Sequence, residues 1–139
     1  MNSFLWKPNE IVKRMPGVST RQIADMAEKG VIKPLVKADG PGTSRLYNQN
    51  GVFSFMVAQV VRRYLSQDDL RAVVKRIVGL RERNEMKNLC VFATRPDVLD
   101  IFFYDEMPEF SDCPFYLNYH CHHIFNLKEI DNHVKERFT

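Results

Sequence analysis

The chain has 139 residues, enough for one domain of common size, and its hydrophobic share of 45% is normal for a globular protein. No apolar run approaches the roughly 20 residues of a membrane span, the first ten residues lack a signal-peptide pattern, and three cysteines are too few for a disulfide framework. These features exclude a membrane protein and a secreted disulfide scaffold, and we expect a cytoplasmic protein.

Charge is unevenly distributed along the chain. Residues 1–86 contain 15 Lys and Arg against 8 Asp and Glu, a net charge of +7, whereas residues 87–139 contain 5 against 9, a net charge of −4. The two halves sum to the +3 of the whole chain. A basic half joined to an acidic half predicts that one end binds a polyanion and the other end has a separate task.

The first thirty residues predict a helix, a tight turn and a second helix. Residues 8–10 open the first helix, which ends at Pro16-Gly17 because proline disfavours helix in the residue before it. Ser19 is a favourable N-cap for the second helix, and Gly30 is its expected end. The inward face of this second helix consists of Ile23, Met26 and Ala27.

The segment VIKPLVKADGPGTSRLY predicts a β-hairpin with a glycine-bearing tip. Asn48 can then cap an apolar helix, and Ser66 with Asp69 gives the [ST]-x-x-[DE] start of another helix. The β-rich runs NLCVFAT and VLDIFFY follow, CPFYLNYHCHHIF could hold further strands, and NLKEIDNHVKERF predicts a terminal helix capped by Asn126.

These elements predict a mainly helical α+β fold. Its expected parts are a winged helix-turn-helix in residues 1–65, a linking or dimerisation helix in residues 66–86, and a small β-rich module ending in a helix in residues 87–139. The last part would serve dimerisation or effector sensing.

The segments EIVKRMPGVSTRQIADMAEKGVIKP and GPGTSRLYNQNGV carry a family resemblance over about residues 4–80. In their order and spacing they resemble the DNA-binding domain of the MerR family of bacterial transcriptional regulators. The matching features are Val18-Ser19, Arg21, Gly30, Pro34 and Arg45-Leu46-Tyr47. The resemblance implies a homodimer that binds a pseudo-palindromic promoter site, with RNA polymerase as a further candidate partner and no cofactor.

The candidate DNA contacts fall on three segments. A recognition helix reads base edges with side chains near its N-terminus, and a wing contacts phosphates. The candidates are Ser19, Thr20, Arg21, Gln22 and Lys29 on the second helix, Lys37, Thr43, Ser44, Arg45 and Tyr47 in the wing, and Arg62 and Arg63, with Lys33 beside Lys37 as a further phosphate candidate. For Tyr47, core packing beneath the wing is the competing interpretation. The chain departs from the family at residues 24–27, so the family's base preference does not carry over.

The CPFYLNYHCHHIF segment contains the metal-ligand types Cys113, His120, Cys121, His122 and His123. Their spacing matches no familiar zinc finger, and neighbouring residues of a strand point to opposite faces. We therefore expect strand residues and no metal site.

Two other classes of function remain for comparison. Cys121 with His120 or His133 could make a nucleophile and base, but no enzyme signature surrounds them, and we expect no enzymatic activity. A DNA-binding accessory factor, excisionase-like or antitoxin-like, whose C-terminal part binds another protein, is the alternative to a regulator. The effector, the operator and the direction of regulation do not follow from the sequence.

Overall fold

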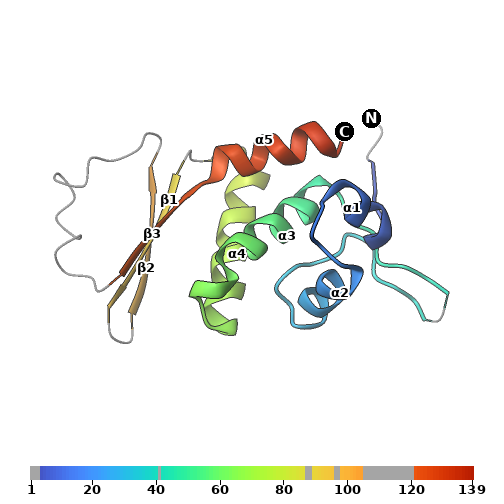
Figure 1. Ribbon diagram of the computed structural model, residues 1–139, viewed down its shortest axis with the longest axis horizontal. Helices are drawn as coiled ribbons and strands as arrows, with labels where there is room; N and C mark the ends of the chain where they lie inside the picture. Colours follow the sequence, from blue (N-terminus) through green and yellow to red (C-terminus); the bar gives the residue numbers. More distant parts are fainter. Residues whose placement is uncertain (1–3, 41, 87–88, 96–97, 105–120) are drawn as a thin grey trace.

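The computed structural model describes residues 4–40, 42–86, 89–95, 98–104 and 121–139 (Figure 1). The helices are α1 (Pro8–Arg14), α2 (Thr20–Glu28), α3 (Gln49–Val61), the 3-10 turn η1 (Arg62–Tyr64), α4 (Gln67–Glu82) and α5 (Leu127–Arg137), and the strands are β1 (Leu89–Arg95), β2 (Val98–Tyr104) and β3 (Cys121–Asn126). None of the described helices combines the length and the apolar character that a bilayer span requires.

Side-chain caps fix where four of the helices begin. The expected N-caps are confirmed: Ser19 Oγ accepts a hydrogen bond from the Gln22 amide at 3.2 Å, and Asn48 Oδ1 accepts one from the Gly51 amide at 2.9 Å. Ser66 and Asn126 accept in the same way from the amides of Asp69 and Glu129. Each cap satisfies an amide that has no partner within its own helix.

Glycine ends the first two helices, as the sequence predicts. Gly17, in the turn after α1, has φ +85°, and Gly30, directly after the C-cap of α2, has φ +73°. Both values lie in the left-handed region that glycine enters without steric cost.

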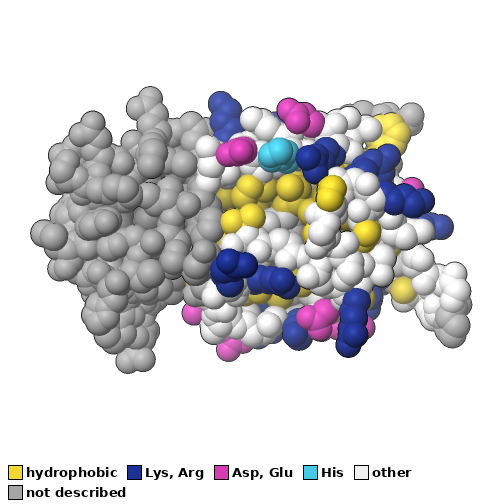
Figure 2. All heavy atoms as spheres, viewed as in Figure 1, with side chains coloured by type: hydrophobic (Ala, Val, Ile, Leu, Met, Phe, Trp, Pro, Cys, Tyr) yellow, Lys and Arg dark blue, Asp and Glu magenta, His cyan; other side chains and the backbone are white. Residues whose placement is uncertain are grey.

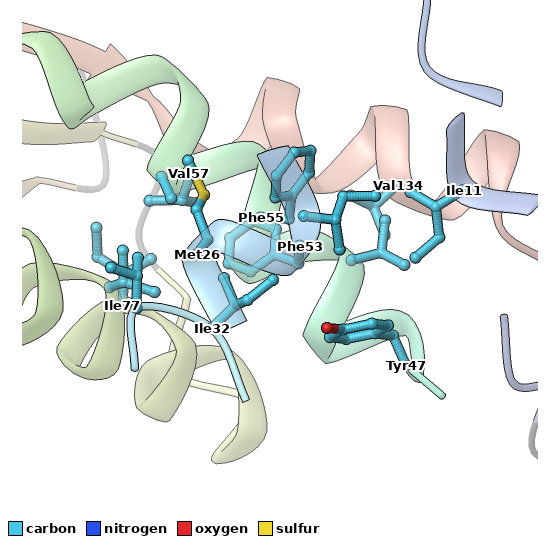
Figure 3. Packing of buried hydrophobic residues seen from close by; sticks show 14 of the residues in the cluster. Ile11, Met26, Ile32, Tyr47, Phe53, Phe55, Val57, Ile77 and Val134 are labelled. Atoms are coloured by element: carbon cyan, nitrogen blue, oxygen red, sulfur yellow. The ribbon is translucent and has the colours of Figure 1, made fainter. Parts of the chain in front are cut away.

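The hydrophobic core is built around α3. This helix is apolar on almost every side, because α4 and α5 both pack against it. Figure 3 shows Phe53 and Phe55 of α3 among side chains from α1, α2, α4 and α5. The fully buried members of α4 and α5 are Val73, Ile77, Leu127 and Val134, and Phe138, directly after α5, is buried with them.

The expected α+β fold class is wrong for the part of the chain whose side-chain packing is described. That part is a body of five α-helices. In its described residues, the segment expected to form a hairpin wing contains no strand, and a single bridge joins Val36 to Leu46. The apolar residues Val31 and Ile32, expected in a strand, instead turn under α2 and bury at 5% and 3% exposure.

The three strands lie outside this helical body. They form an antiparallel sheet in the order β2-β1-β3, in which Arg95 pairs with Val98 and Leu89 pairs with both Tyr104 and Asn126. Figure 1 places the sheet at one end of the molecule, away from α1 and α2. Because Asn126 ends β3 and caps α5, the last strand continues directly into the helix that runs back along the body.

Candidate nucleic-acid interface

α2 is amphipathic, as the sequence predicts. Ile23 and Met26 are buried at 1% and 5% exposure, whereas Thr20 and Arg21 in the first turn are exposed. The first-turn amides of the helix have no partner within it and point outward with the positive end of the helix dipole. This end of α2 therefore combines the guanidinium of Arg21, the hydroxyl of Thr20 and the amides of these two residues on one surface, whereas the Gln22 amide is capped by Ser19.

Ser19 and Gln22, two of the expected DNA contacts, bind each other. Gln22 Oε1 accepts a hydrogen bond from the Ser19 amide at 2.9 Å, and Ser19 Oγ accepts one from the Gln22 amide. This reciprocal capping box stabilises the start of α2. A bidentate contact of Gln22 with adenine needs its oxygen as well as its nitrogen, so Oε1 would have to accept a second hydrogen bond.

Asp25 and Lys29 form an ion pair on the outer face of α2. The Lys29 Nζ to Asp25 Oδ2 distance is 3.0 Å, and both side chains are about half exposed, at 52% and 54%. The i, i+4 spacing is the sequence signal for this pair. Asp25, which would repel a phosphate by itself, is thus balanced by a neighbouring cation.

The loop of residues 33–47, which we call the basic loop, extends from the body on one side of α2 (Figure 1). Lys33, Lys37 and Ser44 are exposed, and Arg45 is half-buried. Thr43 has an internal role, because its hydroxyl accepts from the Asp39 amide at 2.8 Å and donates to the Gly40 carbonyl at 2.7 Å.

Tyr47 lies in the core, at 1% exposure. Its backbone pairs with Trp6 through two hydrogen bonds of 2.8 and 2.9 Å, and its hydroxyl has no hydrogen-bond partner among the described residues. Burial raises the pKa of the phenol, and the nearby charge of Arg45 opposes that rise in part. In this position the ring offers no surface to a phosphate.

Arg62 and Arg63 lie in η1, beside a cleft of about 400 Å³ that separates α2 from the start of α4. Both side chains are exposed, and neither forms an ion pair within the described residues. Figure 2 shows Lys and Arg side chains grouped below a band of hydrophobic surface on the described part of one face. Cations therefore occur on both sides of α2, in η1 and in the basic loop.

The candidate metal ligands lie mostly beyond what the structure describes. Cys113 and His120 are outside the described residues, and the side chains of Cys121, His122 and His123 in β3 are also not described. Elsewhere in the described chain, no group of three or more His, Cys, Asp and Glu residues is arranged to hold a metal ion.

Arg81 of α4 forms a polar cluster that sequence reasoning missed. Its Nε donates to Asp131 of α5 at 2.8 Å, its other nitrogens donate to Gln49 and Asn50 of α3, and its guanidinium lies 5.2 Å from the Phe53 ring centroid. Arg81 and Asp131 side chains are each only 11% exposed. No local pattern marks the cluster, because Arg81 is 31 to 50 residues away from its hydrogen-bond partners in the sequence.

Asp131 is ionised within this cluster. Burial by itself would raise the pKa of its carboxyl group, but hydrogen bonds from Arg81 and Lys135, and their charges, outweigh burial and lower it. At neutral pH the Asp131 carboxylate is therefore charged, and the cluster links α3, α4 and α5 through the Arg81 guanidinium.

No protein-family model matches the chain, and no curated protein matches it.

Proposed function

We propose that the chain is a DNA-binding transcriptional regulator of the MerR type. The observation that carries the proposal is the exposed first turn of α2. Thr20 and Arg21 face solvent there, while Ile23 and Met26 of the same helix are buried. A helix presented in this way, after a tight turn from α1, suits the major groove. The net charge of +7 over residues 1–86 supplies the attraction to a polyanion.

The contacts divide by chemistry. Arg21 is suited to a bidentate contact with guanine, and Thr20 can contact a base edge or a phosphate. Lys33, Lys37 and Ser44 of the basic loop, together with Arg62 and Arg63, would bind phosphates and fix the register of the complex. Thr43 and Tyr47 are not part of this proposed surface, because the first holds the loop tip and the second is buried.

We propose that two copies act together on a pseudo-palindromic site. α4 lies in residues 66–86, which the sequence predicts to be a linking or dimerisation helix, but its apolar side packs on α3 of the same chain, with Val73 and Ile77 at 0% exposure. A second copy must therefore use another surface. On α3, Val60 is exposed and Met56, one turn before it, is half-buried, and we propose this face of α3 for the contact with the second copy. Light scattering at micromolar concentration tests this step, and a monomer would contradict it.

Selection of genomic DNA tests the function directly. Purified protein is incubated with sheared DNA of the source organism near physiological salt, and the bound fragments are sequenced. Enrichment of a few fragments that share an inverted repeat supports a dimeric regulator. Uniform recovery of all fragments contradicts sequence-specific binding. Sites at recombination ends, away from promoters, would favour the accessory-factor function over regulation.

Substitution of Arg21 tests the recognition helix. On a selected site, Arg21→Ala is expected to cost about 1–3 kcal/mol of binding free energy and to relax the preference at one base pair. Lys75→Ala is the matched control, because Lys75 is an exposed cation on α4, outside the proposed surface. Equal losses in both variants would show that only total charge matters.

A further inference from the structure

The cleft between α2, η1 and α4 combines an apolar floor with a charged rim. Its floor is formed by Met26, Val31 and Leu70, each 5% exposed, together with half-buried Leu65. A duplex phosphate passing over a surface contacts only the rim of such a cleft. The apolar floor is therefore a feature that phosphate contacts do not explain.

The rim carries an excess of positive charge. Lys29, Arg62 and Arg63 face one carboxylate, Asp25, which is already paired with Lys29 at 3.0 Å. The two arginines make no ion pair within the described residues, so their guanidinium groups can bind an anion. Gln67 adds a neutral amide. Concave surfaces of one sign focus the electrostatic potential and raise the local concentration of the opposite ion.

The start of α4 adds little to this attraction. Its N-terminus carries Asp68 and Asp69, which already oppose the positive end of the helix dipole, and Asp68 is paired with Arg71. The arginines of η1 therefore dominate the charge at the rim.

We propose that this cleft binds a small organic anion with an apolar body and a single phosphate or carboxylate group. The anionic group would lie between Arg62 and Arg63, and the apolar body would cover Met26 and Leu70. The volume of about 400 Å³ is within the range of small-molecule sites. Asp25 disfavours a second anionic group on the α2 side. This site goes beyond DNA binding and does not depend on it.

Phenyl phosphate is the probe, and the methyl group of Met26 is the reporter. Protein with ¹³C-labelled methionine methyl groups is titrated with phenyl phosphate by NMR in the absence of DNA, and the Met26 signal is assigned with Met26→Leu. The Met26 signal is expected to shift and saturate, and inorganic phosphate is expected to bind more weakly because it cannot cover the floor. The absence of a saturable Met26 shift would overturn the proposal.

A double substitution tests the role of the arginines. R62A/R63A is expected to weaken phenyl phosphate binding at least tenfold, which is about 1.4 kcal/mol. K13A/K75A removes the same charge from two exposed lysines on α1 and α4 and is expected to bind as the unmodified protein does. If both double variants bind phenyl phosphate equally weakly, only the net charge of the protein matters, and the proposal is overturned.

A parallel measurement of DNA binding separates this inference from the proposed function. If the protein binds no specific DNA but the Met26 shift saturates, the small-anion site stands and the regulator proposal fails. If R62A/R63A weakens DNA binding while phenyl phosphate leaves Met26 unchanged, the arginines serve phosphates of the duplex only. That second result would overturn the small-anion site.

Discussion

The buried hydroxyl of Tyr47 makes this residue a sensitive test of the core beneath the basic loop. Removing an unpartnered buried hydroxyl removes a desolvation cost and leaves the packing of the ring intact. Tyr47→Phe is therefore expected to leave the free energy of unfolding unchanged or to raise it by up to about 1 kcal/mol, as measured by urea denaturation. Tyr47→Ala, which empties the same site, is expected to cost about 3–5 kcal/mol.

The pH dependence of the same variant gives a second readout. Because burial raises the pKa of Tyr47, the folded state holds the phenol protonated where an unfolded tyrosine ionises, near pH 10.0. The associated stability is present below that pH and is lost as the pH rises through the folded pKa. The advantage of Tyr47→Phe over the unmodified protein should grow above pH 10.0. A constant difference would place the hydroxyl in contact with water.

The ion pair between Arg81 and Asp131 is expected to stabilise the folded protein. Arg81→Ala leaves a carboxylate that is 11% exposed without its main partner, and the free energy of unfolding is expected to fall by about 3 kcal/mol. Lys135→Ala is the control, because Lys135 contacts the same carboxylate but is 59% exposed, and it should cost less than about 1 kcal/mol.

The lowered pKa of Asp131 sets the pH at which this stability disappears. Stability from the ionised carboxylate is present above the ordinary value of 3.8 and is lost as the pH falls through the lower, folded pKa. The difference between the unmodified protein and Asp131→Asn should therefore shrink in strong acid. Chemical denaturation over an acid pH series measures it, and a pH-independent difference would contradict the ionised pair.

At the scale of elements, the start of α2 depends on Ser19. Ser19→Ala removes the acceptor for the Gln22 amide and is expected to lower the free energy of unfolding by about 1 kcal/mol. Ser44→Ala, in the exposed basic loop, should change it by less than about 0.5 kcal/mol. If the proposed DNA binding is then measured, Ser19→Ala is expected to weaken it through lost helix stability, and Ser44→Ala through loss of the proposed phosphate contact.

Local signals explain which elements could be predicted. Ser19 and Gln22 are three residues apart, as are Asn126 and Glu129, so caps and helix starts follow from the sequence. The β-prone Leu35 and Val36 did not become a strand, because they are 57% and 43% exposed and bury no face. The expected hairpin wing was wrong for the same reason: β propensity does not reveal whether a segment has a partner face to pack against.

The candidate site was predictable where it depended on one helix and not where it depended on packing between elements. The outward position of Arg21 follows from the helical period around Ile23 and Met26. Whether Tyr47 faced DNA or the core depended on its pairing with Trp6, 41 residues earlier in the chain (47 − 6 = 41), which no local pattern encodes.

At the scale of the whole molecule, the two ends of the described chain pack together. Phe138, beyond α5, meets the Trp6 ring edge-on at 5.4 Å between centroids, and its carbonyl accepts from Gln49 Nε2 at 3.1 Å. The Arg14 guanidinium lies 5.9 Å from the Phe138 ring centroid, and Arg137 donates to the Arg14 carbonyl. α5 therefore connects the sheet to the residues that hold the base of the basic loop.

Trp6 is the single tryptophan of the chain, so its fluorescence reports on this junction. Phe138→Ala removes a ring that is 1% exposed and is expected to cost about 3–5 kcal/mol and to shift Trp6 emission to the red in the folded state. Lys75→Ala is the control, because Lys75 is exposed on α4, outside the proposed surfaces, and its loss should change neither quantity appreciably. Since α1, α3 and α5 share one core, Trp6 fluorescence and far-UV circular dichroism should report the same unfolding midpoint. If Trp6 emission changes well before helicity is lost, α5 and the N-terminal segment form a separate, weaker unit.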